Sequence, residues 1–194
     1  MIAITGHASG IGQALFKKYP GSLGFDLANG YDIDRDIDLI IDESKNCNIF
    51  INNAYYLNCQ TDLLSAWVDA HKQDKFIIIN ISSMIADLNL DVGKEFPTLL
   101  EYATHKRNLN KLSFDVNNLG YCCKSVNIML SLVDTNFKIL DDSPVDNHGY
   151  IDKKAVRIAS NRLIKVDEVV KHIEYAIQSF SQQSFISSLS ILNL

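Results

Sequence analysis

The sequence predicts an α/β fold, in which a doubly wound and mostly parallel sheet of about seven strands is flanked by helices. Short runs rich in β-branched residues alternate with helical patterns along the chain, as in repeated βα units. The run Phe76–Ile81 is nearly all apolar, which is typical of a strand buried on both faces. A length of 194 residues fits one such domain, so we expect residues 1–194 to form a single unit.

The first half of the chain predicts four strands separated by helices. Ile2–Thr5 is an apolar run typical of a strand, and the next segment places Ile11, Leu15 and Phe16 on one side of a helix. Pro20-Gly21 ends that helix. In order, we expect a strand at 2–5, a helix at 10–18, a short strand at 23–26, a brief strand at 31–33, a helix at 37–44, a strand at 49–51 and a helix opened by Thr61-Asp62.

The second half continues the alternation and adds one irregular segment. The central strand at 76–81 is followed by a long loop, a helix at about 102–117 and a strand at 125–131. Residues 136–164 are polar and irregular, with one helix near 155–163, and segments of this character close over active sites. We therefore expect a substrate flap at about 136–164. An amphipathic helix at 166–179 and a strand at 185–192 complete the pattern.

Composition excludes several classes of protein. With 18 Lys and Arg against 23 Asp and Glu, the net charge is −5, so we expect no nucleic-acid partner. The chain starts without a basic segment and apolar run, and it has no 18 consecutive apolar residues, which predicts a cytoplasmic protein that does not span a membrane. Its four cysteines and five histidines lack metal-ligand spacing, so we expect reduced thiols and no metal.

A glycine-rich turn stands where the first strand becomes the first helix, with the sequence Thr5-Gly6-His7-Ala8-Ser9-Gly10-Ile11-Gly12. Glycines let the backbone approach a pyrophosphate closely, and the helix N-terminus offers N–H groups and a positive dipole end. The turn predicts a dinucleotide site, with a glycine-rich turn that binds nothing as the alternative. The residues expected to contact the cofactor here are Gly6, Ser9, Gly10, Ile11 and Gly12.

The spacing Thr-Gly-x-x-x-Gly-x-Gly resembles the opening motif of the short-chain dehydrogenase/reductase family, which has a Rossmann-type fold. Asp26, at the end of the second strand, lies where an acidic residue accepts hydrogen bonds from the adenosine ribose. A carboxylate there repels a 2′-phosphate, so we expect NAD rather than NADP, unless Asp26 is a solvated turn residue. Asp32-Ile33 resembles the acidic-aliphatic pair that lies beside the adenine in the family.

Tyr102 and Lys106 are four residues apart and therefore lie on one face of a helix. Helix-surface packing explains many such pairs, but a carbonyl reductase needs this chemistry, because a nearby cation favours the phenolate of a tyrosine. Ser83 follows the central strand and resembles the family serine that orients the substrate carbonyl, although a turn serine is the alternative.

Two further segments match the family in order. Asn52-Asn53-Ala54 resembles its Asn-Asn-Ala-Gly motif, and Leu130–Thr135 resembles the segment that meets the nicotinamide, which adds Asn53, Ala54, Val133 and Thr135 to the expected cofactor site. The resemblance, to a shortened member, implies hydride transfer between NAD and a small alcohol or carbonyl compound. It assigns the general acid/base to Tyr102, the carbonyl contact to Ser83, and the nicotinamide ribose to Lys106.

Departures from the family pattern leave alternatives open. Tyr55 replaces the glycine of Asn-Asn-Ala-Gly, and Asn58 is a candidate for the family's proton-relay asparagine or a polar loop residue. A catalytically weak dinucleotide sensor, or an epimerase or dehydratase, would keep parts of the same motifs. The family also forms dimers through the shortened helix, so its apolar stripe is either core or homodimer interface: Leu63, Leu64, Trp67 and Val68.

Overall fold

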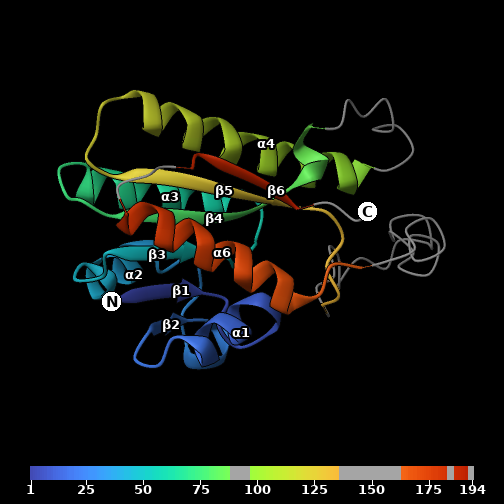
Figure 1. The fold of residues 1–194 in the computed structure, drawn as a ribbon, viewed down its shortest axis with the longest axis horizontal. Coiled ribbons are helices and arrows are strands. Elements are labelled where there is room, and N and C mark those ends of the chain that lie inside the picture. Colours follow the sequence, from blue (N-terminus) through green and yellow to red (C-terminus); the bar gives the residue numbers. More distant parts are fainter. Residues whose placement is uncertain (88–96, 136–162, 183–185, 192–194) are drawn as a thin grey trace.

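The computed structural model describes residues 1–87, 97–135, 163–182 and 186–191. Its centre is a parallel sheet in the order β2-β1-β3-β4-β5-β6 (Figure 1). The first strand, β1, lies inside the sheet, with β2 on one side and the later strands following in order on the other. This is the doubly wound arrangement that the alternating pattern predicts. The strands are β1 (Ile2–Thr5), β2 (Leu23–Phe25), β3 (Ile49–Asn52), β4 (Ile77–Ser83), β5 (Lys124–Leu130) and β6 (Ser188–Ile191).

Helices cover both faces of the sheet. The cluster on one face joins α2, α3 and α4 to side chains of β1, β3 and β4, and the cluster on the other joins α1 and α6 to the opposite faces of the strands. Burial on both faces explains why the central strands are nearly all apolar. The helices are α1 (Gly10–Lys18), α2 (Ile37–Ser44), α3 (Cys59–His71), α4 (Pro97–Asn118) and α6 (Val166–Ser181), with 3₁₀ turns η1 (Leu27–Asn29) and η2 (Met84–Asp87).

Three buried asparagines interrupt the apolar centre of the sheet. Asn52, Asn80 and Asn127 are register partners on β3, β4 and β5. The Asn52 amide donates to Asn80 Oδ1 at 3.1 Å, and the Asn80 amide donates to Asn127 Oδ1 at 3.2 Å and to Ser125 Oγ at 2.9 Å. Because a buried amide is costly without a partner, this ladder fixes the register of the central strands.

The structure corrects one predicted element, the brief strand at 31–33. This segment is a turn, in which Asp32 Oδ1 accepts the N–H of Asp34, Asp36 Oδ2 accepts the N–H of Asp32, and the Asp32 carbonyl accepts the N–H groups of Arg35 and Asp36. Aspartate side chains favour such local bonding over a ladder. The described residues therefore form six strands, and not the seven that we expected.

The other predicted elements that lie on described residues are confirmed within about five residues, and two helices, at 10–18 and 37–44, have the predicted bounds. The predicted helix near 155–163 is not among them, because nearly all of it lies outside the described residues. The predicted flap lies almost wholly outside the described residues. The apolar stripe on α3 is core, since Leu63, Leu64, Trp67 and Val68 are each at most 5% exposed, and Trp67 stacks on Phe50 with 4.5 Å between the ring centroids. This stripe therefore offers no surface for a dimer.

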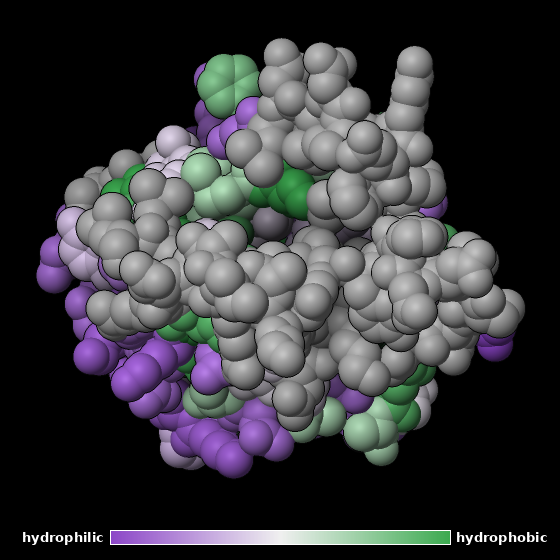
Figure 2. Space-filling view, turned by 90° about the vertical axis from the view of Figure 1, so that its right-hand side faces the viewer, coloured by the Kyte–Doolittle hydropathy of each residue, from purple (hydrophilic) through white to green (hydrophobic). Residues whose placement is uncertain are grey.

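All six strands point the same way, so their carboxyl ends meet at the edge on the right of Figure 1. In Figure 2, which looks onto that end, hydrophilic residues gather on the lower left flank, and a small group of hydrophobic ones shows above the centre. Open α/β sheets bind ligands at this edge. Within the described ranges, no helix combines the length and apolar character that crossing a membrane requires.

Candidate functional site

The glycine turn joins β1 to α1 in a conformation that needs its glycines. Gly6 and Gly10 have φ of +70° and +53°, in the left-handed region. A Cβ on Gly12 would stand 2.0 Å from the carbonyl oxygen of Gly6, so only glycine fits there. At the N-cap of α1, Ser9 makes no side-chain cap and the first turn holds no acidic residue, while Ile11 packs onto the core. This N-terminus suits an anion.

A hydrogen-bonded brace ties the end of β3 to this turn. Thr5 Oγ1 accepts the N–H groups of Asn53 and Ala54, each at 3.0 Å. In return, the Asn53 amide donates to the carbonyl oxygens of Thr5 and Gly6, at 3.0 and 3.3 Å. The structure thus brings Asn53 and Ala54 against the glycine turn, where they hold its backbone in place.

Asp26 lies beside the glycine turn at the end of β2. Its Oδ2 accepts the N–H of Ala8 at 3.3 Å, and its Oδ1 accepts the N–H of Ala28 at 2.9 Å as the cap of η1. Each carboxylate oxygen can accept a further hydrogen bond. Asp26 is therefore a turn cap that keeps acceptor capacity for a ligand hydroxyl, so its capping role and the predicted ribose contact are compatible.

Asp32 and Ile33 lie in the turn that connects β2 to α2. Asp32 bonds to residues of its own turn, and the guanidinium of Arg35 lies 3.8 Å from its carboxylate. Ile33 is 8% exposed and belongs to the core beside α2 and α3. In the free chain these two residues therefore shape the connection between β2 and α2.

The segment after β5 reaches the glycine turn from the other side. Thr135 lies beside Gly10, since its Cγ2 would be 3.6 Å from a Cβ built on that glycine. Val133 forms an isolated parallel bridge with Ile164, and the N–H of Asp134 donates to the Ile164 carbonyl at 2.9 Å. The structure therefore brings Thr135 together with the residues at the start of α1.

Ser83, Tyr102 and Lys106 come together at the carboxyl edge of the sheet. Ser83 ends β4, while Tyr102 and Lys106 lie one turn apart on α4. Burial raises the pKa of Tyr102 to about 12, and a hydrogen bond between its phenol and the Ser83 side chain opposes that rise. Ser83 Oγ also accepts the N–H of Ile85 at 3.3 Å, which holds its side chain at the strand end.

The Lys106 amino group is buried and held by neutral oxygens. Its Nζ donates to Gln60 Oε1 at 2.5 Å and to the Ile81 carbonyl at 2.8 Å. No carboxylate in the described part of the chain pairs with it, and burial lowers the pKa of Lys106 to about 7. The Lys106 Nζ also lies over the Tyr102 ring, 5.4 Å from its centre.

The fold matches solved structures over nearly the whole chain. A short chain dehydrogenase from Burkholderia cenocepacia J2315 in complex with NADP has a TM-score of 0.68 at 14% identity, covering 98% of this chain and 87% of that one. The alcohol dehydrogenase of Thermococcus sibiricus, complexed with 5-hydroxy-NADP, has a TM-score of 0.66 at 14% identity, covering 100% and 96%. The chain has the short-chain dehydrogenase/reductase fold.

The 3-alpha-hydroxysteroid dehydrogenase of Pseudomonas sp. B-0831, complexed with NADH, matches with a TM-score of 0.63 and 19% identity, covering 98% of this chain and 94% of that one. No protein-family model and no curated protein matches the sequence. The likeness to short-chain dehydrogenases is therefore one of three-dimensional fold and of short motifs.

Gln60 is a site residue that sequence reasoning missed. Besides accepting from Lys106, its amide donates to the carbonyl oxygens of Asn52 at 2.8 Å and Ile81 at 3.3 Å. Asn58, the relay candidate, instead faces Asp62 at the start of α3. Gln60 lies two residues further on, and the available signal was an amide on the first turn of a helix that opens at the carboxyl edge.

Tyr55, which replaces the family glycine, fills the space beside Tyr102 and Lys106. Its ring meets Tyr102 edge-on with 4.8 Å between centroids, and its hydroxyl hydrogen-bonds His105 Nδ1 at 3.0 Å. The Lys106 Nζ is 5.0 Å from the centre of the Tyr55 ring. This departure from the short-chain dehydrogenase motif places a second phenol next to the first.

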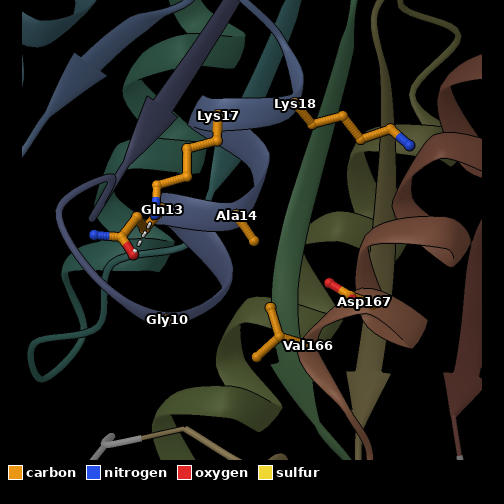
Figure 3. Close-up of a pocket in the computed structure, with 7 residues that line it drawn as sticks. All are labelled: Gly10, Gln13, Ala14, Lys17, Lys18, Val166 and Asp167. Carbon is orange, nitrogen blue, oxygen red and sulfur yellow. Dashed lines mark hydrogen bonds between the residues drawn. The ribbon is translucent and has the colours of Figure 1, made fainter.

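An open hollow of about 570 Å³ lies between α1 and α6, away from this pair (Figure 3). In it the Lys17 amino group donates to Gln13 Oε1 at 3.1 Å, and Lys18 pairs with Glu174 at 2.9 Å. Gly10 alone among its lining residues belongs to the glycine turn. The described residues contain no group of three metal-ligating side chains, here or elsewhere.

Burial of Lys106 predicts that stability rises with pH. The pKa of Lys106 is about 7 in the folded chain and 10.5 when exposed, so between these values the unfolded chain binds more protons. The free energy of unfolding therefore decreases as the pH falls toward 7, because the amine binds a proton more tightly in the unfolded chain than when it is buried. Buried thiols with a raised pKa act in the opposite sense and offset part of this gain near pH 8.5. We therefore expect a net gain of about 1 kcal/mol between pH 7 and 8.5, measured by urea unfolding.

Lys106→Met is the control for this pH dependence, because it removes the titrating group and leaves the other ionisable groups in place. The free energy of unfolding of the variant should be nearly flat over the same range. Parallel pH curves for the variant and the unsubstituted protein would contradict the assignment.

Proposed function

We propose that the chain is a short-chain dehydrogenase/reductase that transfers hydride between a nicotinamide cofactor, with NAD preferred, and a small alcohol or carbonyl compound. The observation that carries the proposal is the meeting of Ser83, Tyr102 and Lys106 at the sheet edge that also holds the glycine turn. Binding a dinucleotide requires neither the serine nor the phenol, so their presence together favours catalysis.

The residues present fit such a cofactor. Because Gly12 has no side chain, the start of α1 packs directly against the Gly6 carbonyl, and this close packing would present the N–H groups at the helix N-terminus to a pyrophosphate. Gly6, Ser9, Gly10 and the N–H groups of Ile11 and Gly12 would hold the pyrophosphate. Asp26 would accept from the ribose hydroxyls, and the nicotinamide end would lie near Asn53, Ala54, Val133 and Thr135, with Asp32 and Ile33 toward the adenine. When bound, the nicotinamide supplies or accepts the hydride.

The side chains of the chain itself would handle the proton and the carbonyl oxygen. With its pKa raised to about 12, Tyr102 is protonated near neutrality and suits proton donation to a substrate oxygen. The Ser83 hydroxyl would hold the same oxygen and stabilise charge that develops on it. Lys106 would hold the nicotinamide ribose, and a proton on its amino group would favour the phenolate that remains after transfer.

The test is a panel of alcohols with NAD and of ketones with NADH, followed by absorbance of NADH, beside binding titrations of NAD and NADP. Turnover of at least one substrate class supports the proposal. Cofactor binding without turnover of any compound would favour the alternative, a dinucleotide sensor. Absence of binding by either cofactor would reject both functions.

Asp26→Asn is expected to weaken the preference for NAD. The substitution keeps a cap acceptor for Ala28 but removes the charge that repels a 2′-phosphate. We expect the ratio of the Kd of NADP to that of NAD to fall about tenfold, which corresponds to ~1.4 kcal/mol. Asp38→Asn, an exposed change of the same charge on α2, is the control. Tighter binding of NADP than NAD by the unsubstituted protein would overturn the role of Asp26.

A further inference from the structure

Tyr55 and His105 form a pair that the proposed chemistry does not yet use. Tyr55 directly follows the Asn52-Asn53-Ala54 segment after β3, and His105 lies on α4 next to Lys106. Their side chains are joined by the hydrogen bond between the Tyr55 hydroxyl and His105 Nδ1 at 3.0 Å. The bond links the end of a sheet strand to the helix that carries the proposed acid, across a sequence separation of 50 residues.

The Tyr55 ring touches both members of the proposed catalytic pair. It meets the Tyr102 ring at an interplanar angle of 79°, the edge-on geometry that aromatic pairs favour. The centre of the same ring lies 5.0 Å from Lys106 Nζ, within the range of cation–π attraction. Any movement of Tyr55 would therefore change the surroundings of the proton donor and of the amine at once.

Electrostatically, Lys106 depends on aromatic rings and neutral oxygens. The titratable groups that face it among the described residues are the phenols of Tyr55 and Tyr102, and its hydrogen-bond partners, Gln60 and the Ile81 carbonyl, are uncharged. A buried ammonium costs free energy unless nearby groups favour its charge. The negative face of each ring is the remaining source of such support.

We propose that Tyr55, oriented by His105, is a positioning residue that holds the Tyr102 ring in place and favours the charged form of Lys106. The inference rests on the proposed function for its catalytic meaning. Its physical core, support of the Lys106 charge by the Tyr55 ring, concerns the free protein and can be tested without a substrate or a cofactor.

The first experiment titrates Lys106 in the free protein by NMR, with ¹³C at the lysine Cε and Lys106→Arg to assign the signal. Tyr55→Leu keeps an apolar cover but removes the ring, so the titration midpoint should fall by about one pH unit. Tyr55→Phe keeps the ring and should retain the midpoint. Tyr56→Leu, a change of the exposed neighbouring tyrosine, is the matched control. An unchanged or raised midpoint in Tyr55→Leu overturns the proposal.

The second experiment measures kcat and KM on a substrate found by the panel. We expect Tyr55→Leu to lower kcat about tenfold with KM little changed, as for a group that orients the reacting residues. A raised KM at unchanged kcat would assign Tyr55 to substrate binding and overturn the positioning role.

A double-mutant cycle tests His105. Tyr55→Phe and His105→Ala each remove the same hydrogen bond, so the double variant should be no slower than either single variant. Independent effects that multiply would reject the pair. If the unsubstituted protein turns over nothing, the proposed function fails, while the NMR titration still decides whether Tyr55 supports the Lys106 charge.

Discussion

Tyr102→Phe is expected to lower kcat by about 10³-fold while the affinity for NADH changes less than twofold. The substitution removes one oxygen from a side chain that contacts Tyr55 and Ser83, so the ring packing survives and the proton donor is lost. General acid catalysis contributes about 10² to 10⁴ in rate, which sets the scale of the expected loss. The measurements are steady-state NADH absorbance and a fluorescence titration of NADH.

Tyr56→Phe is the matched control for this variant. Tyr56 is 51% exposed and lies close in sequence to the site, so removing its hydroxyl should leave the rate unchanged. Retention of full activity by Tyr102→Phe would show that another group moves the proton, and would remove the catalytic assignment of Tyr102.

The second large effect is expected from Gly12→Ala. The new Cβ would meet the Gly6 carbonyl oxygen at 2.0 Å and the Asn53 amide at 2.8 Å, and the first of these atoms is backbone that cannot rotate away. Overpacking of this kind costs about 1 to 3 kcal/mol or more. We expect the free energy of unfolding to fall by that amount and the affinity for NAD to fall by at least a hundredfold, because α1 must move away from the turn that would cradle the pyrophosphate.

Gly21→Ala separates this clash from the general effect of losing a glycine. Gly21 has φ of +86°, but no heavy atom lies within 4 Å of the position that a Cβ would take, so alanine there adds backbone strain without a clash. Its variant should lose about 1 kcal/mol of stability and keep cofactor affinity. Equal cofactor affinities in the two variants would mean that the Gly6–Gly12 approach does not shape the binding site.

Elements whose stability comes from their own pattern were predictable. The helix at 10–18 follows from apolar spacing and from the Pro-Gly that ends it, and the strand at 76–81 follows from its continuous apolar run. The turn at 31–33 was missed because hydrogen bonds from Asp32 and Asp36 compete with sheet pairing, and a three-residue run gains too little from a ladder to overcome them.

For the candidate site, motifs predicted which side chains gather but not what surrounds them. The resemblance to the short-chain dehydrogenase motifs selected Ser83, Tyr102 and Lys106, and the fold brings them to one edge of the sheet. Gln60 and Tyr55 contact Lys106 across separations of 46 and 51 residues, which depend on where α3 begins relative to α4. No local pattern encodes such a distance, so these contacts required the three-dimensional structure.

The asparagine ladder across β3, β4 and β5 has a consequence for how the chain finds its fold. These strands meet across separations of 28 and 47 residues, so many misaligned pairings of isoleucine-rich segments compete during collapse. A shift of one residue would strand each amide among apolar side chains, at about 1 to 3 kcal/mol for every unmatched group. The asparagines thus destabilise misaligned strand pairings whose hydrophobic burial would be as favourable as that of the native pairing.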